Sequence, residues 1–135
     1  MKLKKITLLG IFFLFSTLYG QEGKKLFEAK CASCHITYRP HNISALVAPP
    51  ITGVMRHVKM HFNTKDEAIV FISDYVLNPT HSKALCKSQK MMNFGLMPSQ
   101  KGNVTEKELE KIASWMYDNF PVKRIYQNRQ NNIGE

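Results

Sequence analysis

The stretch that most constrains this chain of 135 residues is "CASCH", residues 31–35. It places Cys31 and Cys34 with two residues between them and His35 directly behind, although the whole chain has only three cysteines. Several chemistries use such a pair of thiols, and they occur in different cellular compartments. The N-terminus therefore has to be interpreted before the motif.

The N-terminus has the features of an export signal. Three lysines precede an apolar run, residues 6–19, which is broken only by Thr, Ser and Gly. The run is shorter than the ~20 residues that span a bilayer, and Gly20 supplies a small residue for cleavage. We expect residues 1–20 to be a signal peptide and the protein to be periplasmic. The alternative is an uncleaved segment that holds the protein at the membrane surface.

The charge of the remaining chain indicates its partners. Removing residues 1–20 leaves 135 − 20 = 115 residues, which is one small domain, with a net charge of 19 − 3 − 10 = +6. A cationic surface favours acidic protein partners or anionic lipid head groups. The basic residues form no dense block and no nucleic-acid motif, so we expect no nucleic-acid partner.

Three uses of a Cys-x-x-Cys pair fit this chain poorly. A structural zinc site needs two more ligands at fixed spacing, and the chain offers only one further cysteine and four scattered histidines. A thioredoxin-like redox pair needs a strand before the motif, where this sequence predicts a helix. A disulfide between Cys31 and Cys34 leaves His35 unexplained.

Covalent haem explains all three residues of the motif. Two thiols can add across the two vinyl groups of a haem, and the adjacent imidazole then binds the iron. Cys-x-x-Cys-His is the signature of c-type haem attachment, which in bacteria follows export. We therefore predict one haem c, bound through thioethers to Cys31 and Cys34, with His35 as the proximal iron ligand.

The methionines of the chain are candidates for the second, distal iron ligand. Met97 stands in "NFGLMPSQ", where Pro98 fixes the local backbone and Gly95 adds freedom just upstream. A loop of this kind can carry a thioether to the distal face of a haem that is bound far away in sequence. Met91 and Met92 are alternative candidates for the distal ligand.

From about Gly23 to Phe120 the chain resembles the class I c-type cytochromes. The parts come in the family's order: a helix leading into "CASCH", then "APPITG", a middle helix, "GLMP" and a C-terminal helix. The resemblance implies that Met97 is the distal ligand opposite His35. It also implies that the Pro49 carbonyl accepts the ring N–H of His35, a contact that orients the ligand and tunes the iron.

Helical periodicity predicts an all-α, cytochrome c-like domain of three main helices with long loops around one haem. The first helix is expected to run over residues 23–31, into the motif. The other two, over residues 64–79 and 105–121, end at a proline and open on capping boxes: Thr64 with Glu67, and Thr105 with Glu108.

The long loops would be unusual in an ordinary domain, but a haem can supply the apolar core that they surround. In the family that the chain resembles, the first and last helices cross at a glycine and aromatic side chains, which Gly23, Phe27 and Trp115 match. We assign residues 21–121 to the cytochrome c domain and residues 122–135 to a polar C-terminal tail.

The third cysteine, Cys86, has no partner if the other two bind haem. We interpret it as a small, buried apolar side chain. Two alternatives stay open: a reactive thiol activated by neighbouring lysines, and a disulfide between two chains.

A haem iron closed by histidine and methionine has no open position, so its useful change is the gain or loss of one electron. We predict a periplasmic electron carrier rather than an enzyme, steered to the acidic surfaces of oxidases, reductases or dehydrogenases by basic residues. The candidates for this basic rim are Lys30, Arg39, Lys83, Lys87, Lys90 and Lys101.

Three other functions remain possible at this point. The first is a haem-carrying subunit of a larger periplasmic oxidoreductase, for example in sulfur-compound oxidation. The second is a haem enzyme or gas-binding protein in which Met97 does not bind the iron. The third is a non-haem metal or thiol module.

Overall fold

The structure is a computed structural model that describes residues 20–38, 41–42, 44–86 and 88–120. The described residues form helices and loops without a strand, which confirms the all-α prediction. A first helix covers residues 20–30, and four more follow: α2 (Ile51–His61), α3 (Lys65–Leu77), α4 (Ser88–Phe94) and α5 (Glu106–Asn119). None of the described helices is long and apolar enough to cross a membrane. Most of the expected signal peptide and the whole tail lie outside the described residues.

Helices α3 and α5 begin at the two predicted capping boxes. The Thr64 hydroxyl accepts from Glu67 N at 3.2 Å, and Glu67 Oε2 accepts from Thr64 N at 3.2 Å. In α5 the Thr105 hydroxyl accepts from Glu108 N at 3.3 Å, and Glu108 Oε2 accepts from Thr105 N at 2.8 Å. Each box satisfies two N–H groups that a helix start would otherwise leave without a partner.

Helices α2 and α4 fall in stretches for which the sequence predicts loops. Helix α2 follows Pro50, which makes no side-chain capping bond, and its first N–H, on Ile51, donates to Ile36 O at 2.9 Å. Its buried residues Ile51, Met55 and Val58 recur at helical spacing and face the core. Helix α2 is therefore tied directly to the segment that follows the motif.

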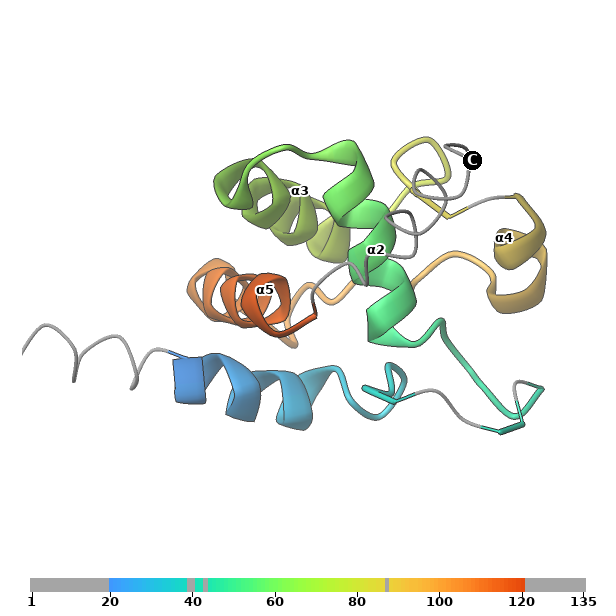
Figure 1. The fold of residues 1–135 in the computed structure, drawn as a ribbon, viewed down its shortest axis with the longest axis horizontal. Helices are drawn as coiled ribbons and strands as arrows, with labels where there is room; N and C mark the ends of the chain where they lie inside the picture. Colours follow the sequence, from blue (N-terminus) through green and yellow to red (C-terminus); the bar gives the residue numbers. More distant parts are fainter. Residues whose placement is uncertain (1–19, 39–40, 43, 87, 121–135) are drawn as a thin grey trace, which may run out of the picture.

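Helix α5 lies between α3 and the helix of residues 20–30 (Figure 1). At the crossing with residues 20–30, an added Cβ on Gly23 would lie 2.3 Å from Lys111 O and 2.7 Å from Trp115 Cβ. The rings of Phe27 and Trp115 are in contact, with a centroid distance of 5.1 Å and a tilt of 44° between their planes, so the predicted crossing is confirmed.

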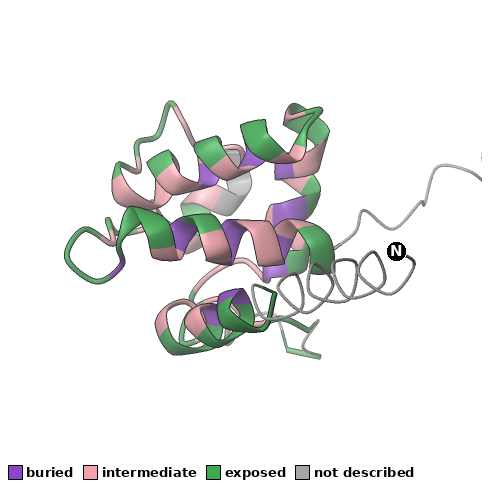
Figure 2. Cartoon of the chain, turned by 90° about the vertical axis from the view of Figure 1, so that its left-hand side faces the viewer, coloured by how far each residue is buried: buried purple, intermediate pink, exposed green. Residues whose placement is uncertain are grey.

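Buried residues lie on the inward faces of these helices, and exposed residues lie on the outer faces (Figure 2). The four largest fully buried side chains come from three elements that are far apart in sequence: Phe27, Met55, Leu109 and Ile112. The core therefore joins the segment before the motif to the last helix.

Candidate functional site

A cavity of about 310 Å³ extends between the motif and the "GLMP" loop. Its walls are mainly apolar and include side chains from the first helix, α2, α3, α4 and α5. Among the apolar wall residues are Phe27, Ile51, Val58, Ile72, Leu109 and Met116. The volume lies in the range of cofactor and ligand pockets, and a wall of this composition excludes water.

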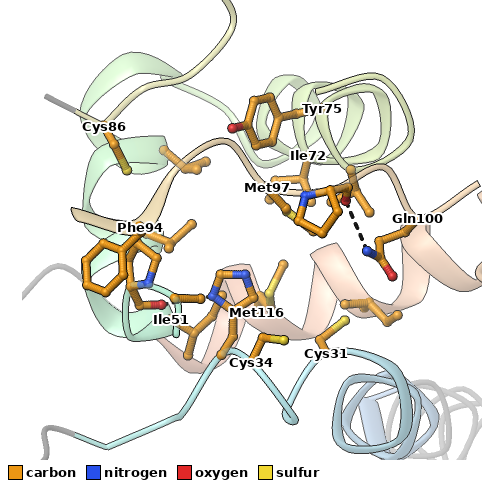
Figure 3. A pocket seen from close by; sticks show the side chains of 18 of the residues that line it. Cys31, Cys34, Ile51, Ile72, Tyr75, Cys86, Phe94, Met97, Gln100 and Met116 are labelled. Atoms are coloured by element: carbon orange, nitrogen blue, oxygen red, sulfur yellow. Dashed lines mark hydrogen bonds between the residues drawn. The ribbon is translucent and has the colours of Figure 1, made fainter. Parts of the chain in front are cut away.

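The motif borders this cavity. It is held there because the helical turns of the first helix continue through the motif. Cys31 N donates to Phe27 O at 2.8 Å, and His35 N donates to Cys31 O at 2.9 Å, so the chain keeps a helical turn through the motif. Both thiols border the cavity from the same side (Figure 3). Cys31 is partly buried and Cys34 is exposed, and neither forms a disulfide.

His35 is oriented by the backbone of "APPITG". Its Nδ1 lies 2.9 Å from the carbonyl oxygen of Pro49, and both residues line the cavity. A carbonyl oxygen can only accept, so Nδ1 carries the hydrogen in this contact. The other ring nitrogen, Nε2, then keeps its lone pair and is the atom available to bind a metal.

The environment of Cys31 disfavours its thiolate. Burial raises the pKa of the Cys31 thiol to about 11, with the nearby Lys30 charge acting in the opposite direction. In the closed fold this sulfur is therefore protonated at neutral pH and is a weak nucleophile. Cys34, which is exposed, differs from it in access to solvent.

Met97, which is far from the motif in sequence, lines the same cavity. Figure 3 shows it across the cavity from Cys31 and Cys34. The loop is attached to the end of α3 just beyond Met97, since Ser99 Oγ donates to Leu77 O at 2.6 Å and Gln100 N donates to Val76 O at 3.0 Å.

The two alternative distal candidates have different surroundings. Met91 lines the cavity, whereas Met92 is 78 % exposed. Sequence reasoning treats these neighbours alike, and only the orientation of α4 separates them.

The cavity wall also includes His57, Tyr75 and Cys86. Burial, with a smaller contribution from the neighbouring Cys86, raises the pKa of the Tyr75 hydroxyl. Cys86 is partly buried, whereas the sequence predicts a buried side chain, and it forms no disulfide in this single chain. The signal that marks Tyr75 is its place on the apolar stripe of α3; nothing in the sequence marks His57 or Cys86 as wall residues.

The basic residues expected around the site differ in their exposure and in their ion pairs. Lys30 lines the cavity and pairs with Glu108 at 3.7 Å, and Lys83 pairs with Asp74 at 2.6 Å. Lys101 is exposed. Arg39 and Lys87 lie outside the described residues, as does the side chain of Lys90.

The residues at the cavity fit a covalently attached haem. Two thiols border it, an imidazole with one free nitrogen stands beside them, and a thioether lies across from the thiols. Imidazole and thioether are iron ligands of c-type haem, and the apolar wall suits the macrocycle. The same set is a poor match for a hard cation, which prefers oxygen ligands.

Comparison with known proteins agrees with this chemistry. Residues 20–116 match the model of the family described as cytochrome c oxidase, cbb3-type, subunit III, which is a family of c-type cytochromes. The match covers well over half of the chain, so the protein belongs to this family. An uncharacterized protein of Aquifex aeolicus (strain VF5) is 30 % identical over 113 residues, which cover 74 % of each chain. No solved structure gives a significant match.

Proposed function

We propose that this protein transfers single electrons between redox partners through one haem c that is attached to Cys31 and Cys34. His35 is the proximal iron ligand and Met97 the distal one. The observation that carries the proposal is that the three motif residues and Met97, which is far away in sequence, meet at one mainly apolar cavity. When bound, the haem supplies a one-electron change at its iron.

The residues of the chain have distinct tasks in this proposal. Pro49 O holds the ring of His35 in one orientation and one tautomer. The apolar walls keep water from the iron, which limits structural change between the two redox states. Because Cys34 is exposed, the attachment side of the cavity is the side that a partner protein can approach.

We further propose that the protein works in the periplasm after removal of residues 1–20. The family match begins at residue 20, where the proposed signal ends, which supports this division. The net charge of +6 that remains favours docking to acidic surfaces of oxidases, reductases or dehydrogenases. Such docking weakens as ionic strength rises.

A second candidate is a haem-carrying subunit of a larger periplasmic oxidoreductase. The description of the matching family, which names an oxidase subunit, favours it. The two candidates share the same site residues and differ in whether the protein leaves its partner. Stable co-purification with another subunit from the native membrane or periplasm supports the second, and recovery as a lone soluble protein supports the first.

The test is the visible spectrum of protein matured in a host that attaches c-type haem, recorded oxidised, reduced, and reduced with carbon monoxide. Covalent haem in denatured protein, a low-spin spectrum with the near-red methionine–iron(III) band, and no response to carbon monoxide are expected. A carbon monoxide-sensitive spectrum would contradict Met97 ligation and favour a haem enzyme or gas-binding protein. A protein without covalent haem would contradict the proposal as a whole.

A further inference from the structure

One short segment places three sulfur-bearing side chains around the cavity. Cys86 precedes α4, Met91 lies within α4, and Met97 follows it, and all three line the same cavity as His35. The proposed function uses only Met97. Two further thioethers line the cavity: Met116, which is buried on the core face of α5, and Met91, which is not part of the core and requires its own explanation.

The orientation of α4 directs Met91 inward. Met91 and Phe94 are three residues apart, so they lie on the same face of the helix, and both line the cavity. Met92, the next residue, is 78 % exposed. The helix therefore presents one methionine of the "MM" pair to the cavity and the other to solvent.

Met91 and Met97 are attached to the fold at different places. The Met97 loop is bound to the end of α3 through Ser99 and Gln100. Met91 sits on α4, whose end is marked by Gly95: its N–H donates to Met91 O at 2.9 Å, and its φ is +70°.

Gly95 separates the two attachments. An added Cβ there would meet nothing within 4 Å, so the conformation, and not a lack of space, requires glycine. The residue that joins α4 to the Met97 loop is therefore one whose backbone has access to more conformations than any other residue type.

We propose that Met91 is a second thioether ligand, which binds the haem iron when Met97 is displaced. The inference rests on the proposed function, because it assumes a haem whose proximal ligand is His35. Methionine has three rotatable side-chain bonds and adapts to irregular space, so a residue already at the cavity wall can extend to the iron without refolding α4.

Exchange of one thioether for another has a chemical advantage. Both ligands are neutral and soft, so the charge at the iron and its low-spin state are kept. Two other sulfurs outside the motif lie at this wall. Met116 is packed in the core of α5, and Cys86 would bind most strongly as a thiolate and would add a negative charge in an apolar pocket. The exchange keeps the iron closed to small molecules while the Met97 loop moves.

The experiment compares the haem-loaded wild type with Met97→Ala and three double variants. These add Met91→Ala, Met92→Ala or Cys86→Ser to Met97→Ala. The near-red band of thioether-bound iron(III) and binding of carbon monoxide to the reduced form are recorded, and circular dichroism verifies the fold. The variant with Met92→Ala is the matched control, because it removes the adjacent, exposed methionine.

We expect Met97→Ala to retain a thioether band, shifted in position, and to resist carbon monoxide. Met97→Ala/Met91→Ala should lose the band and bind carbon monoxide, while Met97→Ala/Met92→Ala should behave like Met97→Ala. A band-free, carbon monoxide-binding Met97→Ala protein would overturn the inference and leave the proposed function intact. A low-spin state abolished only by Cys86→Ser would also overturn it, in favour of thiolate ligation. Absence of the near-red band from the wild-type protein would contradict the proposed function, and the inference that rests on it would be overturned as well.

Discussion

His35 takes its orientation from a backbone carbonyl, and this choice of partner matters at the level of a single residue. Pro49 O cannot be protonated in the range in which proteins function, in contrast to the carboxylate that often holds a metal-binding histidine. The hydrogen on Nδ1 therefore has a constant acceptor. We expect the orientation of the ring to be insensitive to pH.

The two cysteines of the motif should each form one thioether. Cys31→Ser and Cys34→Ser should each remove one attachment and shift the reduced spectrum to longer wavelength, because one vinyl group stays conjugated to the macrocycle. Cys31→Ser/Cys34→Ser should yield no covalent haem on a denaturing gel stained for haem.

Cys86→Ser is the matched control for these variants, since Cys86 lines the same cavity but stands outside the motif. It should retain both thioethers and the wild-type position of the bands. Loss of covalent haem in Cys86→Ser, with retention in Cys34→Ser, would show that the attachment sites are assigned wrongly.

Among the helices, the crossing of residues 20–30 with α5 depends on the absence of a side chain at Gly23. Gly23→Ala would place a Cβ against Lys111 O and Trp115 Cβ, both of which belong to a packed helix. We expect the haem-loaded variant to lose about 1–3 kcal/mol of unfolding free energy, as overpacked cores do. Urea unfolding followed by circular dichroism measures the change.

Lys25→Ala provides the comparison on the same helix. Lys25 is exposed and lies within the mature chain, and alanine has the higher helix propensity. Its stability should equal or exceed that of the wild type. Equal losses in the two variants would mean that the crossing does not depend on close approach at Gly23.

The N-terminus of α5 should give the stability a dependence on pH. Hydrogen bonds from Thr105, backbone first and side chain second, hold the pKa of Glu108 below its usual value of 4.5. A lowered carboxyl pKa means that the stabilisation is present above the unfolded-state value and is lost as pH falls through the folded-state value. Glu108→Gln should therefore flatten the acid side of the stability profile, measured by urea unfolding at several pH values.

Glu106→Gln is the control for this prediction, because Glu106 lies in the same first turn but is not the capping residue. Its profile should keep the acid-side decrease of the wild type. Parallel profiles for Glu108→Gln and the wild type would contradict the role of the capping carboxylate.

The elements differ in how far the sequence predicts them, and the reason is physical. Helices α3 and α5 carry their start signals locally, in the threonine and glutamate of each capping box. Helix α2 has no side-chain cap, and its first N–H depends on Ile36 O, a contact that exists only in the folded chain. Helix α4 has only seven residues, too few for a periodic signal.

In the site, too, some residues are predicted by local sequence patterns and others depend on the folded structure. The motif brings Cys31, Cys34 and His35 together through local spacing, so the sequence predicts them as a group. The inward direction of Met91 and the place of Tyr75 and Cys86 at the cavity wall depend on how α3 and α4 lie in the fold. No local pattern contains that information.

For the molecule as a whole, the apolar cavity adjoins the packed core, and several core side chains, among them Phe27, Leu109 and Ile112, also line it. Without a group in the cavity, these walls lose packing partners on one side, which destabilises the fold. We expect the protein without haem, obtained as Cys31→Ser/Cys34→Ser, to lose fixed tertiary packing. Near-ultraviolet circular dichroism and thermal unfolding measure this, with the haem-loaded Cys86→Ser protein as control. A sharp, wild-type-like transition without haem would contradict the expectation.

The crossing of the first helix with α5 also has a consequence for the order of events in the cell. The helix that leads into the motif packs against α5, which follows it far along the chain and is therefore synthesised after it. The burial that raises the pKa of Cys31 exists only in the folded protein. If the proposed haem attachment takes place before α5 packs against the first helix, we expect both thiols to be accessible at that stage and the fold to close afterwards.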